Sequence, residues 1–293
     1  MSDDLDPRLY AFRDDLADQR LEGQVRADRY VDGKDAVVAS HFADVLSRPD
    51  PTSGLNTQFL HGQQVVVFET RDGWSWIQNR ADGYVGYTKS SNLTFEPADT
   101  RAVATHMVVA PRTFLYSNAD LKSPRSGYRS MGSKLVVVGV QETRGTQYAM
   151  LSSGDAVIAG HLTSMDQLPG DPVAIAETLL HAPYLWGGNT GFGLDCSGLV
   201  QLSHMVCGAV TLRDSDMLAG TIGDEIEADF ERLQRGDLVF WKGHVGVMAD
   251  GKNLLHANGH TMNVAVEDLQ QAISRIGYLY GQPTIVRRPH PIA

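Results

Sequence analysis

The hydrophobic positions near the start of the chain recur at near-helical spacing. A segment that is otherwise rich in charged residues contains four regularly spaced apolar residues, Leu9, Phe12, Leu16 and Leu21. Apolar residues at such a spacing gather on one face of an α-helix. The pattern predicts a short amphipathic helix over residues 7–22. We expect this helix to form an N-terminal arm, residues 1–24, that packs on a later domain.

The pattern changes after this arm to short runs of β-branched and aromatic residues. QVVVFET, WSWIQNR and YVGYTK are strand-like, and the turn signals Asp72-Gly73 and Asp82-Gly83 separate them. Several short strands at this spacing are typical of a small barrel. The sequence therefore predicts a β-barrel domain over residues 25–98.

Residues 99–168 repeat this pattern more weakly. Their four candidate strands are MVVAPRTFLYS, KLVVVGVQETRG, QYAMLSS and DAVIAGHL. The likeness to the first region is one of pattern, with little identity. We interpret the segment as a second barrel of the same kind, and a generic β extension of the first barrel is the alternative.

The last part of the chain, residues 169–293, begins with a proline-containing linker and a helix. Asp171 is placed as N-cap and Pro172 as the first helical residue of this helix. Helical patterns come first, and the strands DLVFWKG, HVGVMAD, NLLHANG and IVRRP follow. Helices followed by antiparallel strands predict an α+β domain.

Charge and hydropathy argue against a nucleic-acid-binding protein and against a membrane protein. The formal net charge is -10, which argues against a nucleic-acid partner because phosphate binding requires a basic surface. No apolar stretch approaches the roughly 20 residues of a membrane span, so no membrane partner is expected. The first residues lack the basic start and apolar run of a signal peptide, which predicts a cytoplasmic location.

The two cysteines, Cys196 and Cys207, are predicted to be free thiols. A helix between them would separate them by about 16 Å, whereas a disulfide requires Cα atoms within about 7 Å. Cys207 lies among apolar residues and is expected to be a buried structural thiol. Cys196 follows a glycine-rich loop and begins a helical pattern. The free N–H groups and the dipole at a helix start would stabilise a thiolate there and an oxyanion beside it.

A thiol nucleophile needs a base, and the chain offers ten histidines. His244 begins a predicted strand, and Gly246 on the same face would leave room for a helix end to approach. His256 lies on the next strand, where antiparallel pairing could bring it beside His244 to orient that ring. Two alternatives stay open from spacing alone. The residues could be structural, or Cys196, His244 and His256 could bind a metal ion, although no short-range ligand pair supports a metal site.

Three ordered elements sharpen this interpretation: Tyr184-Leu185-Trp186-Gly187-Gly188 leading to Asp195-Cys196-Ser197-Gly198, Arg235-Gly236-Asp237-Leu238 leading to His244-Val245-Gly246, and Leu255-His256-Ala257. Together they resemble the NlpC-type cysteine peptidases of bacterial cell-wall metabolism, which have a papain-like fold. The resemblance covers residues 171–293. It implies that Cys196 is the nucleophile, His244 the base and His256 the orienting residue, and that no cofactor or metal is needed. The strand and turn pattern of residues 62–93 resembles a bacterial SH3-like domain.

The layout of two SH3-like domains before an NlpC-type domain resembles the γ-D-glutamyl-L-diamino acid endopeptidases. The resemblance implies cleavage of peptidoglycan-derived tripeptides or tetrapeptides with a free N-terminal L-alanine, in cell-wall recycling. It also implies substrate contacts around the nucleophile, with Asp195 on the L-alanine ammonium and Ser215 on the glutamate carboxylate. The full set of implied substrate-binding residues is Tyr184, Trp186, Asp195, Ser197, Asp214, Ser215 and Tyr84.

The first barrel departs from the pattern of these relatives at one point. They often carry an acid in the G-x-x-V region to help bind the amine, whereas here the region reads Gly62-Gln63-Gln64-Val65. Glu69 is the candidate substitute for this acid.

Two functions of other classes compete with the endopeptidase: a wall-peptide-binding protein with an inactive papain-like domain, and an amidase or acyltransferase on the same scaffold. The oligomeric state and the preferred diamino acid are not predicted.

Overall fold

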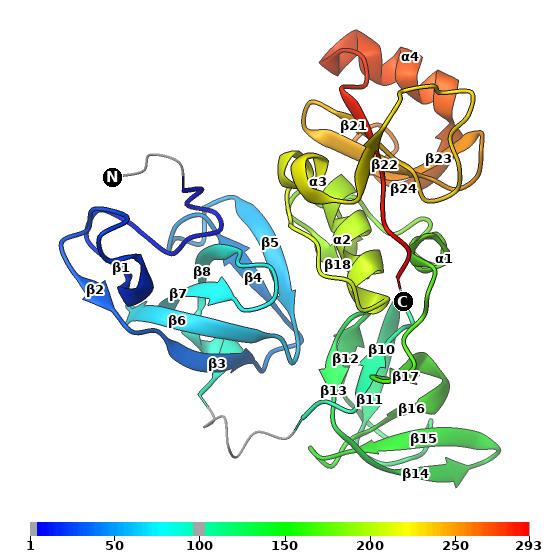
Figure 1. Cartoon of the computed structure of the whole chain (residues 1–293). Coiled ribbons are helices and arrows are strands. Elements are labelled where there is room, and N and C mark those ends of the chain that lie inside the picture. Colours follow the sequence, from blue (N-terminus) through cyan, green and yellow to red (C-terminus); the bar gives the residue numbers. More distant parts are fainter. Residues whose placement is uncertain (1–4, 96–102, 293) are drawn as a thin grey trace. The chain divides into compact units, whose positions relative to one another are not determined.

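The computed structural model describes residues 5–95 and 103–292, and its contacts divide the chain into two compact units (Figure 1). The first unit comprises Met1–Val108 and Thr113–His161, and the second comprises Val109–Arg112 and Leu162–Ala293. The predicted boundary between residues 98 and 99 lies outside the described residues.

The first barrel predicted from the sequence is a seven-stranded sheet with the strand order β5-β4-β8-β7-β6-β3-β9. The three predicted runs are confirmed as consecutive antiparallel strands β6, β7 and β8, and Asp72 and Gly73 both adopt positive φ in the tight turn between the first two. The strand bounds are β3 Lys34–Val38, β4 Phe42–Leu46, β5 Leu55–Leu60, β6 Gln64–Arg71, β7 Trp74–Asn79, β8 Val85–Lys89 and β9 Leu93–Thr94.

The helix predicted over residues 7–22 is wrong. The segment forms turns, the two-residue strand β1 (Ala17–Asp18) and the 3₁₀ turn η1 (Gln19–Leu21), and β1 pairs in parallel with β2 (Tyr30–Val31). Ala11 and Leu16 pack into the core of the first barrel with Val66, Phe68, Trp76 and Val85. The charges of the segment also form ion pairs two residues apart, Arg8–Asp6, Arg13–Asp15 and Arg20–Asp18, and residues at this spacing do not face each other on a helix. Tertiary packing thus overrides the apparent helical period.

The second β region repeats the strand order of the first. Its strands form the sheets β12-β11-β16-β15-β14 and β13-β10-β17, which reproduce the first order with one strand divided into β13 and β14. The run MVVAPRTFLYS splits at Pro111, and strand β12 was not predicted. The bounds are β10 His106–Val108, β11 Arg112–Tyr116, β12 Arg125–Ser130, β13 Lys134–Leu135, β14 Val137–Thr143, β15 Thr146–Leu151, β16 Ala156–Ile158 and β17 Leu162–Ser164, with the 3₁₀ turns η2 at Ser90–Asn92 and η3 at Ala159–His161.

The second unit contains the predicted α+β domain, a six-stranded antiparallel sheet of order β20-β25-β21-β22-β23-β24 with helices beside it (Figure 1). The four predicted strands are confirmed as β21, β22, β23 and β25, whereas β20, β24, α3 and α4 were not predicted. Helix α4 packs on the sheet through Leu269, Ala272 and Ile276, and α2 packs against β22 and β23. The bounds are α1 Pro172–Glu177, β18 Asn189–Thr190, β19 Gly193–Leu194, α2 Cys196–Val206, α3 Ser215–Thr221, β20 Asp224–Ile226, β21 Leu238–Trp241, β22 His244–Met248, β23 Asn253–Asn258, β24 Asn263–Asp268, α4 Leu269–Tyr280 and β25 Ile285–Arg288.

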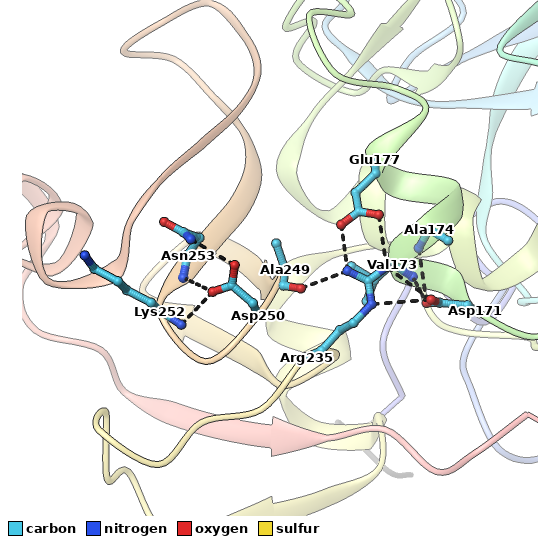
Figure 2. A network of polar contacts seen from close by, with 9 residues as sticks. All are labelled: Asp171, Val173, Ala174, Glu177, Arg235, Ala249, Asp250, Lys252 and Asn253. Carbon is cyan, nitrogen blue, oxygen red and sulfur yellow. Dashed lines mark hydrogen bonds and ion pairs between the residues drawn. The ribbon is translucent and has the colours of Figure 1, made fainter.

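Helix α1 is tied to the sheet through Arg235, as Figure 2 shows. The Arg235 guanidinium donates to Asp171, which is the N-cap of α1 as predicted, to Glu177 at the end of α1, and to the carbonyl oxygen of Ala249. Asp237 accepts both guanidinium contacts of Arg288 on β25. The Arg-Gly-Asp-Leu motif therefore joins α1, β21 and β25 rather than contributing chemistry.

None of the helices formed by residues 5–95 and 103–292 is both long and apolar enough to cross a membrane.

Candidate active site

Cys196 is the first residue of α2, as predicted, and Asp195 is the N-cap. The Asp195 carboxylate accepts the N–H of Gly198 at 2.7 Å, which fixes the first turn of the helix. A side chain at position 198 would bring its Cβ within 2.2 Å of the carbonyl oxygen of Gly188, so this turn requires glycine. The Asp-Cys-Ser-Gly sequence thus holds a thiol at a helix start, pressed against the preceding loop.

The Cys196 thiol is almost completely buried, at 8% exposure. Its sulfur accepts the backbone N–H of Val245, the residue after His244, and the N–H of Ser197. Burial nevertheless raises the pKa of Cys196 to about 12, and the negative charge of Asp195 acts in the same direction. Burial therefore opposes the expected stabilisation of a thiolate by the helix start and favours the protonated thiol.

His244 and His256 meet across two adjacent antiparallel strands, as the sequence predicts. β22 pairs with β23, and Nε2 of His244 lies 2.8 Å from Nδ1 of His256. His256 is completely buried, and His244 contacts Trp241 with 5.7 Å between ring centroids. Because Val245 donates to the Cys196 sulfur, the thiol lies at the start of the strand that carries His244. The structure therefore places the His244 and His256 rings in contact and the Cys196 thiol against the backbone of the residue that follows His244.

Burial, and after it the neighbouring His256, lower the pKa of His244 to about 3. The two shifts favour the uncharged forms of both groups, an imidazole and a thiol. An uncharged imidazole can accept a proton, which is the form a general base requires.

Gly246 has a different role from the predicted one. A Cβ at this position would meet the side chain of Leu254 on β23 at 2.7 Å. The glycine thus accommodates the neighbouring strand's leucine rather than the end of a helix.

Arg213 organises the residues on both sides of the nucleophile, and sequence reasoning missed this role. It is 1% exposed, donates to both carboxylate oxygens of Asp195 at 2.9 and 2.7 Å, and donates to Oγ of Ser197 at 2.8 Å. The Asp195 carboxylate also accepts from Gly187 N–H, Ser197 Oγ–H and Gly198 N–H. Five donors saturate the roughly four lone-pair positions of a carboxylate. An incoming ammonium would have to share Asp195 with these partners.

The other predicted substrate-binding residues occupy different settings. Burial raises the pKa of Tyr184, and so do the neighbouring Cys196 and Asp195. The effect of these two groups places Tyr184 close to the nucleophile. Trp186 is 71% exposed on the loop before α2. Asp214 is the N-cap residue of α3 and Ser215 is the first residue of that helix. Tyr84 belongs to the first unit, where its side chain is buried. Their contacts with substrate stay predictions.

The acid considered in the first barrel is already paired. Glu69 accepts from Arg13 at 2.7 Å and from Arg29 at 2.6 Å. Gln63, which stands where relatives often carry an acid, is buried and its side-chain oxygen accepts the N–H of Leu60 at 3.0 Å. Both side chains therefore hold the barrel together.

Cys207 is free and buried at the end of α2, and burial raises its pKa to about 11. The two cysteines do not form a disulfide, as predicted. Within the described part of the chain, no three His, Cys, Asp or Glu side chains are grouped so that they could hold a metal ion.

Two further residues lie behind the histidine pair and were not predicted. Oε1 of Glu267 on β24 lies 2.7 Å from Nε2 of His256, and Arg275 on α4 forms an ion pair with the same carboxylate. The only sequence signal was an acid at the end of the run NVAVED, and without β24 in the predicted topology it could not be placed.

Comparison with known proteins gives two domain matches. Residues 45–93 match the family model described as "Bacterial dipeptidyl-peptidase Sh3 domain", and residues 181–279 match the NlpC/P60 family. Residues 181–279 are an NlpC/P60 domain. The protein is accordingly a cysteine peptidase, a hydrolase, with an SH3 domain before its papain-like domain.

Similar proteins cover most of the chain. Dipeptidyl-peptidase 6 from Lysinibacillus sphaericus is 27% identical over 258 residues, which cover 82% of this chain and 94% of that protein. A γ-D-glutamyl-L-lysine dipeptidyl-peptidase from Bacillus cereus is 27% identical over 230 residues, which cover 69% of this chain and 67% of that protein. A crystal structure of an NlpC/P60 family protein from Bacillus cereus aligns with a TM-score of 0.73 at 22% identity and covers 88% of this chain and 100% of that chain. This last likeness concerns the fold.

Proposed function

We propose that this protein hydrolyses the γ-D-glutamyl–diamino acid bond of peptidoglycan stem peptides that carry a free N-terminal L-alanine. The observation that supports it most is the contact of His244 with His256, with 2.8 Å between Nε2 and Nδ1, on a strand whose Val245 N–H lies on the Cys196 thiol. The names of the relatives supply the substrate class, since two of them are γ-D-glutamyl-L-lysine dipeptidyl-peptidases.

The proposed reaction begins with a neutral pair. His244 takes the thiol proton as the Cys196 sulfur attacks the γ-carbonyl carbon of D-glutamate, because the thiol is too weak an acid to ionise alone. The carbonyl oxygen becomes an oxyanion, which the N–H groups at the start of α2 would stabilise. The His244 imidazolium then protonates the amine of the departing diamino acid, and a thioester of L-Ala-γ-D-Glu remains on Cys196.

Hydrolysis of the thioester completes the cycle. His244 takes a proton from water, the hydroxide attacks the same carbon, and L-Ala-γ-D-Glu leaves as the free acid. The sulfur departs and recovers its proton from His244. No group besides the peptide, water and the protein's own side chains is required.

Substrate selection is proposed for the residues around the nucleophile. Tyr184, Trp186, Asp195 and Ser197 would line the position of L-alanine, and Asp214 and Ser215 the glutamate carboxylate. A substrate contact of Tyr84 stays a prediction from the sequence resemblance. Because Asp195 and Glu69 are both paired with arginine, we expect the free amine to be preferred rather than strictly required.

The experiment compares L-Ala-γ-D-Glu-diaminopimelate, its lysine analogue and the N-acetylated form of each. Purified protein should release L-Ala-γ-D-Glu from the free peptides faster than from the acetylated ones, as followed by mass spectrometry. Equal cleavage rates for the free and the acetylated peptides would show that the protein does not recognise the free amine. No cleavage of any of these peptides would favour a binding protein with an inactive domain.

The domain boundaries are proposed as 1–24, 25–98, 99–168 and 169–293, with the third segment a second SH3-like barrel. The shared strand order of the two β regions supports this assignment. Limited proteolysis of the full chain should cut first between the segments, and early cuts inside residues 105–164 would contradict it. A role in cell-wall recycling within the cytoplasm remains a prediction that fractionation would test.

A further inference from the structure

A line of polar side chains crosses the sheet from the proposed base to α4. It passes from His244 on β22 to His256 on β23, to Glu267 on β24, and to Arg275 on α4. His256 pairs in register with Ala265, so Glu267, two residues further along β24, is on the same face of the sheet. Each member comes from a different element, which means that the fold itself brings them together.

The protons on this line can be assigned from the chemistry of its acceptor. Arg275 and His256 lower the pKa of Glu267 to about 2 against the opposing effect of burial, so the group is a carboxylate that only accepts hydrogen bonds. Nε2 of His256 lies 2.7 Å from this carboxylate, and two bare acceptors would repel each other at that distance, so we assign a proton to Nε2, although the N–H does not point at the oxygen as a regular hydrogen bond would. The assignment takes the His256 ring in its neutral form, which has one N–H, and Nδ1 of His256 is then left as an acceptor toward His244.

The same logic extends to the base. Nε2 of His244 lies 2.8 Å from the bare Nδ1 of His256 and has to donate to it. The proton of the neutral His244 ring therefore sits on Nε2, and its Nδ1 is the nitrogen with a free lone pair. Only a nitrogen in this state can take a proton from a thiol.

We propose that Glu267, held by Arg275, is a positioning residue that fixes the tautomers of His256 and His244 and so leaves Nδ1 of His244 bare for the thiol proton. This inference rests on the proposed function, in which His244 is the base. Reversing the His256 tautomer would place two N–H groups against each other, or force His244 to present an N–H to the thiol. Either arrangement would prevent proton transfer.

The charged groups that act on His244 besides His256 are Arg275 on α4 and Glu267 on β24. From α2, the Cys196 sulfur contacts the N–H of Val245, the residue after His244. Among these, Glu267 alone contacts His256 through an acceptor. We therefore expect no other side chain of the described residues to take over its role.

The test uses the full chain labelled with ¹⁵N-histidine, with Glu267→Leu, Glu267→Gln and Glu225→Gln. Glu225 lies exposed on β20, at the opposite edge of the same sheet, and is the matched control.

In the parent protein the ring nitrogens of His244 and His256 should both report the Nε2–H tautomer, with the signals assigned by His256→Asn. In Glu267→Leu the His256 signal should move toward the Nδ1–H form, and kcat/KM should fall about 10- to 100-fold, mainly in kcat. Glu267→Gln keeps an acceptor oxygen and should retain the tautomer with a smaller loss.

An unchanged His256 tautomer in Glu267→Leu, or a kcat/KM equal to that of Glu225→Gln, would overturn the inference. Circular dichroism and thermal unfolding identify a variant that fails to fold, and in that event the comparison of Glu267→Gln with Glu225→Gln decides. Failure of the proposed function has a different signature, because the parent protein would then not cleave the peptide while the ring tautomers could still be read.

Discussion

Arg213 and Asp195 form a two-pronged ion pair inside the papain-like domain, with Nη1–Oδ1 at 2.9 Å and Nη2–Oδ2 at 2.7 Å. The arginine is 1% exposed, and it also donates to Oγ of Ser197 and to the carbonyl oxygen of Gly188. The pair therefore ties the glycine-rich loop to the first turn of α2. The position of the Cys196 thiol depends on this contact although Arg213 is 17 residues away along the chain.

Replacing Arg213 by methionine should destabilise the protein by about 3–5 kcal/mol, since it leaves the buried Asp195 charge unpaired. Urea unfolding followed by circular dichroism would measure the loss. Arg232→Met is the control, because Arg232 pairs with Asp229 at 85% side-chain exposure and should change stability by less than about 1 kcal/mol. Similar losses in both variants would contradict a special role of the buried pair.

Cys196→Ala should abolish peptide cleavage and leave the unfolding transition in place, because the nucleophile is lost while a small side chain still fills the helix start. Cys207→Ala should keep activity, since that thiol lies at the other end of α2. Product release measured by mass spectrometry distinguishes the two. Loss of activity in Cys207→Ala with normal stability would show that the wrong thiol was chosen.

The raised pKa of Cys196, about 12, predicts how the reaction rate of this thiol changes with pH. The thiolate is the reactive form, so its alkylation by iodoacetamide should accelerate about tenfold per pH unit from pH 7 to 10. Cys207→Ala provides the background in which only Cys196 can react. A plateau already reached below pH 7 would instead indicate a thiolate–imidazolium pair in the free protein.

The burial of His61 predicts that acid lowers the stability of the first barrel. Burial lowers its pKa from 6.5 to about 4, and its Nδ1 lies 3.0 Å from the carbonyl oxygens of Ala39 and Ser40. The unfolded chain binds more protons than the folded one in this window, so stability should fall as the pH drops from about 6.5 to 4. His61→Gln should flatten this part of the pH dependence of the melting temperature. The exposed His260→Gln is the control, and an equal effect in both would refute the assignment.

The sequence was most informative where local pattern and chemistry agree. Alternating residues identified β22 and β23, and the Asp171-Pro172 and Asp195-Cys196 steps marked the starts of α1 and α2. The meeting of His244 and His256 followed from antiparallel pairing of neighbouring strands, which short connections favour.

The misses share a physical cause. The apolar spacing of the N-terminal arm reflects packing of Ala11 and Leu16 on the first barrel rather than a helix face. The burial of Arg213 and the contact of Glu267 with His256 depend on partners far away in the chain, and neither has a local signature. Such contacts require the alignment of several elements, which periodicity along one segment does not contain.

The place of Glu267 on β24 links the proposed chemistry to the alignment of an outermost strand. β24 is the last strand in the order of this sheet, and beyond it the start of β24, at Asn263 and Val264, bonds to residues 181–183. Neighbouring residues of a strand point to opposite faces, so a slip of β24 by one position would turn Glu267 away from His256. Edge strands are also among the first parts of a sheet to open. On the proposed role of Glu267, a local loosening of this one strand would switch off proton transfer at Cys196 while the remainder of the domain stays folded.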